Sequence, residues 1–128
     1  MLLFGHDYIA YEPFYHISDI EAIAKTPSNS TLFLVFDVNN LDIITYLKEN
    51  AIAFALEVTS LKEAIFAQNL GASYIITDEN NATSIQKCAE HYLFDAKILC
   101  RAHNDEAIER LALEGIDGII FAEAIIKI

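Results

Sequence analysis

Short apolar runs alternate with amphipathic stretches along this chain, the pattern of a repeating β-strand and α-helix. Leu32–Phe36 and Ile52–Leu56 contain no polar residue at all. Strands that are covered on both faces have such sequences, whereas a half-exposed strand alternates apolar and polar positions. The pattern predicts strands in five runs: Leu32–Phe36, Ala53–Leu56, Tyr74–Thr77, Ile98–Cys100 and Ile119–Ala122.

Helix starts can be recognised between these runs. Ser18 and Ser60 are each followed three residues later by a glutamate, the spacing of a capping box, in which each side chain bonds a free backbone amide. Three more amphipathic stretches follow Asn or Asp residues that can cap a helix. They cover residues 41–50, 83–93 and 106–114. The sequence therefore predicts five helices.

The alternation predicts an α/β fold with a parallel sheet of five or six βα units. A chain of 128 residues is the usual size of one domain, and we expect residues 1–128 to form a single α/β domain. A closed barrel usually needs about 200 residues or more, so we favour an open three-layer, flavodoxin-like sheet. The alternative is a partial TIM-like barrel that is completed by dimerisation. The first strand stays open between Tyr8–Tyr11 and Phe14–Ile17, because Pro13 separates them.

Composition and charge exclude several classes of function. The chain has 19 acidic and 8 basic residues, a net charge of −11, which repels nucleic acids and anionic membrane surfaces. No apolar run reaches the roughly 18 residues needed to cross a bilayer, and the first residues lack the features of a secretory signal. We therefore expect a cytoplasmic protein. The two cysteines, Cys88 and Cys100, lack metal-binding spacing and are interpreted as packed thiols.

A charged residue stands at the end of each predicted strand: Asp37, Glu57, Asp78, Arg101 and Glu123. In parallel α/β folds these ends meet at one edge, where ligands bind. Carboxylates there suit general acid–base catalysis or a divalent metal.

These charged residues supply the candidates for a site. Glu57, Asp78 and Glu123 are the catalytic candidates, and Glu57, Glu123 and His16 are the candidate metal ligands. We expect Arg101, His103 and Asp37 to contact a ligand. The alternative for Asp37 and Asp78 is helix capping. Lysine Schiff-base, G-x-S-x-G and nucleotide-loop motifs do not occur.

The C-terminal sequence resembles the last strand–helix–strand units of the ribulose-phosphate-binding TIM-type barrels. The similar positions are residues 113–120, Leu-Glu-Gly-Ile-Asp-Gly-Ile-Ile, and Ala124-Ile125. That resemblance implies a barrel and a phosphate site built on glycine-rich turns. Here Arg101–Asn104 and Phe121–Glu123 stand where those glycines belong. Arg101 and His103 remain as side-chain donors for an anion.

Two functional hypotheses follow. The first is a non-catalytic or degenerate domain that forms a homodimer through its aromatic N-terminal segment, Tyr8–Tyr15, or through a terminal strand. The second is a small metal-assisted lyase or isomerase that acts on an anionic, sugar-phosphate-like substrate. The sequence leaves open whether the protein is an enzyme.

Overall fold

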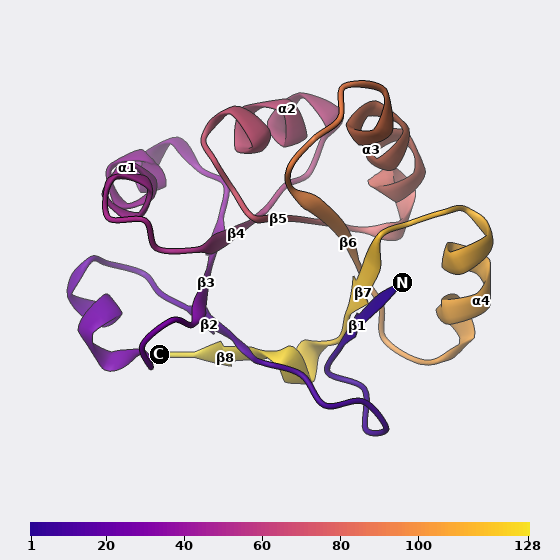
Figure 1. Ribbon diagram of the computed structural model, residues 1–128, viewed down its shortest axis with the longest axis horizontal. Coiled ribbons are helices and arrows are strands. Elements are labelled where there is room, and N and C mark those ends of the chain that lie inside the picture. Colours follow the sequence, from indigo (N-terminus) through magenta and orange to yellow (C-terminus); the bar gives the residue numbers. More distant parts are fainter.

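The computed structural model describes residues 1–128 and contains one sheet of eight parallel strands that curls round on itself (Figure 1). The strand order is β1-β7-β6-β5-β4-β3-β2-β8. The strands are β1 (Leu2–Phe4), β2 (Phe14–His16), β3 (Thr31–Val35), β4 (Phe54–Glu57), β5 (Tyr74–Thr77), β6 (Lys97–Arg101), β7 (Gly118–Ile120) and β8 (Ile125–Lys127).

The helices lie outside the ring of strands (Figure 1). The α-helices are α1 (Leu41–Glu49), α2 (Leu61–Asn69), α3 (Glu79–His91) and α4 (Glu106–Leu113), and the 3₁₀ turns are η1 (Glu21–Lys25), η2 (Val38–Asn40) and η3 (Ala122–Ala124). None of these helices combines the length and apolar character that a membrane crossing requires.

Of the two predicted capping boxes, only the one at Ser60 starts an α-helix. At α2 the Ser60 hydroxyl accepts a bond from the Glu63 amide at 3.1 Å, and the Glu63 carboxylate accepts one from the Thr59 amide at 2.9 Å. At the first site Asp19 accepts a bond from the Ala22 amide, and only the short turn η1 forms. A helix start is therefore predicted in both places, but only one grows into an α-helix.

The core has two layers, one inside the curled sheet and one outside it. Alternate strand residues point inward and pack together from every strand. This inner cluster contains Phe4, Phe14, Phe33, Ala55, Tyr74, Ile76, Leu99, Ile120, Ala124 and Ile125. The other strand residues, such as Leu34 and Leu56, pack outward with residues of the helices. Both faces of the strands are therefore dry, which explains the uninterrupted apolar runs.

The predicted α/β class, the parallel sheet and the five βα units are confirmed, and the units begin at β2, β3, β4, β5 and β6. The sheet takes the curled, barrel-like arrangement rather than the favoured open three-layer one. Strands β2 to β7 are neighbours in chain order, so no reversal sends helices to a second face. Eight strands fit in this length because each has three to five residues and β1 connects to β2 without a helix.

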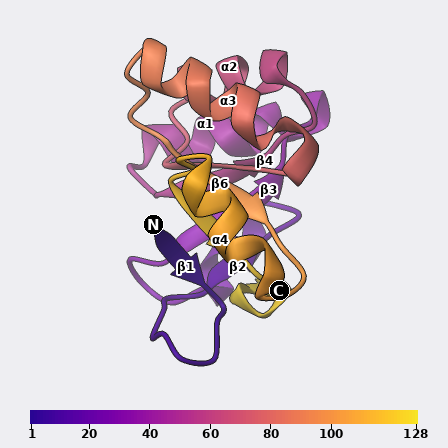
Figure 2. The same ribbon diagram turned by 90° about the vertical axis from the view of Figure 1, so that its right-hand side faces the viewer.

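The chain ends form two strands that the sequence did not predict. The first strand is β1, Phe14–His16 forms the second, and Tyr8–Tyr11 belongs to the loop between them. This loop lies at the end of the molecule opposite to α1, α2 and α3 (Figure 2). Strand β1 pairs with β7, and β8 pairs with β2, so the two termini fill the arc between β7 and β2.

Docking of β1 against β7 provides a test of this arrangement. A Cβ atom at Gly118 would lie 2.7 Å from a methyl group of Leu99 and 2.9 Å from the backbone oxygen of Leu2. We expect Gly118→Ala to lower the free energy of unfolding by about 2 kcal/mol, since the strands cannot move apart without breaking their ladder. Gly115→Ala, at a φ of 78° with no atom within 4 Å, should cost only about 1 kcal/mol. Urea denaturation measures both, and equal losses would contradict this packing.

Candidate functional site

Two charged residues at the carboxyl ends of strands point into the barrel. We call this open end of the barrel its mouth. Glu57 ends β4 and Arg101 ends β6, each one position beyond an outward-facing residue. The Nε of Arg101 donates a hydrogen bond to Oε2 of Glu57, and the guanidinium carbon lies 5.7 Å from the ring centroid of Phe33. The Arg101 side chain is 36% exposed and that of Glu57 is 25% exposed, so this pair is partly dry yet open to solvent.

His16 and Lys127 complete this group from the other side of Phe33. His16, on β2, is in register with Phe33 on β3 and with Lys127 on β8. Its ring lies 4.9 Å from the Phe33 ring in an edge-on orientation. We call His16, Glu57, Arg101 and Lys127 the mouth cluster.

Burial and the charges of the mouth cluster change the pKa of His16. Burial lowers the pKa of His16 below its ordinary value of 6.5, and the positive charge of Lys127 lowers it further. Glu57 opposes this effect and Arg101 adds to it. His16 is therefore neutral at pH 7, and a neutral imidazole can accept a proton or a hydrogen bond from a ligand.

The mouth cluster is positive in an acidic protein. Arg101 and Lys127 carry two positive charges, Glu57 carries one negative charge and His16 is neutral. Because Glu57 bonds the Nε of Arg101, the guanidinium keeps its two terminal nitrogens for another partner. Such a pair of donors matches the two oxygens of a carboxylate or a phosphate.

The structure uses two of the predicted site residues as helix caps. Asp37 accepts a hydrogen bond from the Asn39 amide at 2.8 Å, and Asp78 accepts one from the Asn81 amide at 3.0 Å. This is the capping alternative left open by the sequence. Asp78 also explains why α3 begins at Glu79, earlier than the pattern predicts.

The remaining candidates lie outside the mouth cluster. Glu123 is exposed in η3, where its backbone oxygen accepts a long bond of 3.5 Å from the Tyr11 hydroxyl, and His103 is exposed in the loop before α4. No group of three or more His, Cys, Asp or Glu side chains is arranged to hold a metal ion. Of the predicted metal ligands, the structure brings only Glu57 and His16 to the mouth.

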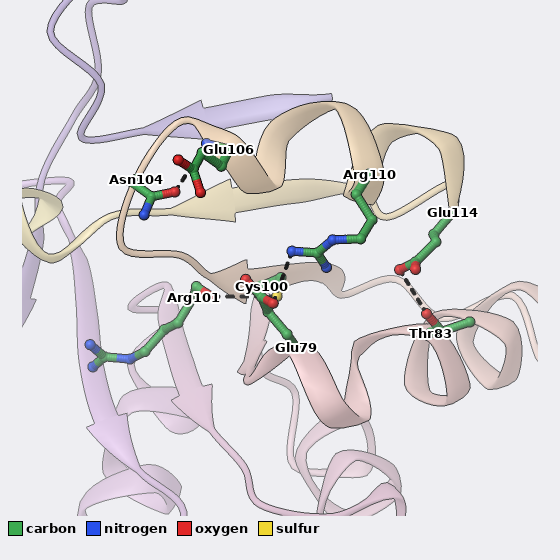
Figure 3. Close-up of polar contacts among 8 residues, drawn as sticks. All are labelled: Glu79, Thr83, Cys100, Arg101, Asn104, Glu106, Arg110 and Glu114. Atoms are coloured by element: carbon green, nitrogen blue, oxygen red, sulfur yellow. Dashed lines mark hydrogen bonds and ion pairs between the residues drawn. The ribbon is translucent and has the colours of Figure 1, made fainter.

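Cys100 points away from the mouth because it precedes Arg101 on β6. Burial, with added effects of Glu79 and Asp78, raises the pKa of the Cys100 thiol to about 12, so it stays protonated at neutral pH. Figure 3 shows this outer side of the strand, with Arg101 directed away from it. There Arg110 bonds Glu79 at 3.0 Å and Thr83 bonds Glu114 at 2.9 Å, which joins α4 to α3.

Sequence reasoning missed Lys127 and the role of Phe33. The relevant signal was the alternation in the last residues, where Ile125 and Lys127 share one face of a strand. Three residues are too short for this pattern to stand out, and the pairing of β8 with β2 joins residues more than a hundred positions apart.

No family model and no curated protein matches this chain. Among solved structures, the crystal structure of a NadC deletion mutant in a cubic space group has a similar, TIM-type fold, with a TM-score of 0.52 and 16% sequence identity. The match covers 91% of this chain and 49% of that one, so the chain spans about half the length of this neighbour. The likeness supports the partial TIM-like resemblance for the fold alone.

The lowered pKa of His16 predicts a pH effect on stability. Because the folded state holds this proton less tightly than the unfolded chain, the resulting stabilisation is present above pH 6.5 and is lost as the pH falls below it. We expect His16→Gln to reduce the loss of stability between about pH 7 and pH 5, measured by urea denaturation. His91→Gln, at an exposed end of α3, serves as the control. Identical pH profiles for wild type and His16→Gln would contradict this origin.

Proposed function

We propose that this protein is a binding domain for a small anionic ligand, a carboxylate or a phosphate, held in the mouth of the barrel. One observation carries the proposal. The guanidinium of Arg101 is fixed inside the mouth by Glu57 and Phe33, with its terminal nitrogens left to a partner.

The fixed position of Arg101 favours binding over a merely structural ion pair. A flexible surface arginine loses side-chain entropy when it binds an anion, whereas this side chain is already ordered by a hydrogen bond and by a ring. The partly dry surroundings strengthen the attraction to an anion relative to an exposed site. Arg101 therefore has the properties of a recognition residue.

Lys127 and His16 extend the site across the mouth. His16 comes from β2, which pairs with the strand of Phe33, and Lys127 comes from β8 on the far side of β2. Lys127 supplies a second positive charge, and neutral His16 can donate or accept one hydrogen bond. A ligand with two anionic ends, or a phosphate ester, would contact both sides of the mouth.

A metal-assisted lyase or isomerase has less support. That reaction requires Glu57 and Glu123 to hold one metal ion, but Glu57 bonds Arg101 and Glu123 lies exposed in η3. An anion bound directly by Arg101 needs no metal ion. We therefore propose ligand recognition and assign no reaction.

Replacement of Arg101 tests the proposal. Isothermal titration of the wild-type protein with phosphate and with succinate should show saturable binding of at least one of them. We expect Arg101→Gln to weaken that binding by about 10- to 100-fold, because a charge-assisted hydrogen bond contributes about 1.5–3 kcal/mol. Arg101→Lys should also lose affinity, since an ammonium cannot make the paired contact.

Arg110→Gln is the matched control, because Arg110 also bonds a glutamate but lies on the outer surface between α3 and α4 (Figure 3). This variant should bind as the wild type does. Failure of both anions to bind, or equal affinity of wild type and Arg101→Gln, would contradict the proposal. Circular dichroism of each variant confirms that the fold is kept.

A second candidate function is self-association, for which the uncovered arc of the barrel is the supporting observation. Helices lie outside most of the ring, but no α-helix lies outside β8 (Figure 1). Apolar side chains are exposed on β8, with Ile126 at 41%, and in the loop after β1, with Tyr8 at 87% and Ile9 at 45%. Exposed apolar surface of this kind favours a contact with a second copy.

Measurement of the mass in solution tests self-association. We expect light scattering to give twice the chain mass of 14.3 kDa for the wild type. The double variant Tyr8→Ser, Ile126→Lys should shift the mass to that of one chain. The variant Leu113→Ser, at an exposed residue of α4, should leave the wild-type mass unchanged. A wild-type mass of one chain would remove this candidate.

A further inference from the structure

A cavity lies at the opposite end of the strands from the mouth cluster. Its volume is about 610 Å³, and it is lined by the first residues of three strands, Phe14 of β2, Thr31 of β3 and Tyr74 of β5. Residues 10–12 of the loop after β1 and residues 27–30 before β3 form its other walls. We call it the lower cleft.

Aromatic side chains dominate the lower cleft. The rings of Phe4, Phe14 and Tyr74 contact one another at centroid distances of 5.0–5.7 Å, and Tyr11 also lines the cleft. The faces of such rings carry partial negative charge and attract cations. This composition distinguishes the lower cleft from the mouth, where the charged groups are an arginine, a lysine and a glutamate.

The single charged residue that lines the lower cleft is Glu12. A carboxylate beside several aromatic rings is the combination that stabilises an organic ammonium ion, through one ion pair and several cation–π contacts. The net charge of −11 raises the local concentration of cations around the whole molecule. Charge and aromatic content therefore favour the same class of ligand.

One wall of the cleft is held in place by its own hydrogen bonds. The Ser30 hydroxyl donates to the Pro27 backbone oxygen at 2.7 Å, and the Ser30 amide donates to the same oxygen at 3.3 Å. A wall that is already ordered lowers the entropy cost of binding. A neighbouring cavity on the far side of this wall is lined by no charged residue, so the lower cleft is the better cation site of the two.

We propose that the lower cleft binds a small organic ammonium ion with methyl or other apolar substituents. Glu12 compensates the charge, while Tyr11 and Tyr74 contact the substituents. The proposal is independent of the anion site, because the two sites share no residue and lie at opposite ends of the strands.

Choline and its neutral isostere 3,3-dimethyl-1-butanol provide the test. Each is titrated into the wild-type protein and followed by isothermal titration, with tyrosine fluorescence as a second signal because the chain contains no tryptophan. We expect choline to bind about tenfold more tightly than the neutral alcohol, since the isostere lacks only the charge.

Two variants assign the binding to the lower cleft. Glu12→Gln should weaken choline binding about tenfold and leave that of the neutral alcohol unchanged, and Tyr11→Ser should weaken the binding of choline. Both residues are exposed, so the fold should be kept. Glu90→Gln, at an exposed position of α3, should bind choline as the wild type does.

The following results would overturn the proposal: no saturable binding of choline, equal affinity for choline and the neutral alcohol, or equal choline affinity of Glu12→Gln and Glu90→Gln. A preference for choline that persists in Glu12→Gln and Tyr11→Ser would place a cation site elsewhere on the protein. Phosphate binding to the mouth cluster is measured separately, so failure at one site leaves the other unaffected.

Discussion

The whole structure depends on the packing of one apolar layer inside a curled sheet. Strands of three to five residues bury little surface by themselves, and each contributes one or two side chains to this layer. Large rings, Phe14 and Phe33, pack in one cluster with small residues such as Ala55 and Ala124, so the interior is filled without a wide barrel. The outward-facing side chains of the same strands pack against the helices and form the outer layer. Loss of either layer would leave the strands without cover on one face.

This packing also decides what each charged residue at a strand end does. Side chains alternate along a strand, so Leu56 and Cys100 point outward and their successors Glu57 and Arg101 point inward. Burial of a charge is costly unless it is paired, and the bond between Arg101 and Glu57 meets that requirement at the open end of the barrel. Asp37 and Asp78 leave their strands at once and bond the amides of the next helix. The charged residues at the carboxyl ends of the strands therefore have two roles: Glu57 and Arg101 point into the mouth, and Asp37 and Asp78 cap helices.

The two ends of the barrel have opposite chemical character. The mouth combines positive side chains with one aromatic ring, whereas the lower cleft combines several aromatic side chains with one carboxylate. The terminal strands β1 and β8 run between these ends, and apolar side chains remain exposed on β8 and in the loop after β1. In this acidic protein, Arg101 and Lys127 place two positive charges at the mouth against the one negative charge of Glu57.

The sequence by itself determined the class of fold, the parallel direction of the strands and the capping box of α2. These depend on short-range rules: periodicity, capping residues such as Ser60, and the apolar character of strands such as β3 and β4. It also identified Glu57, Arg101 and His16 as residues near the strand ends. Tertiary structure alone decided that the sheet curls rather than lying open, that β1 and β8 exist, and that Lys127 lies beside His16. The physical reason is that pairing between the chain termini and the middle strands is long-range, and three-residue strands become stable only when their neighbours are already in place.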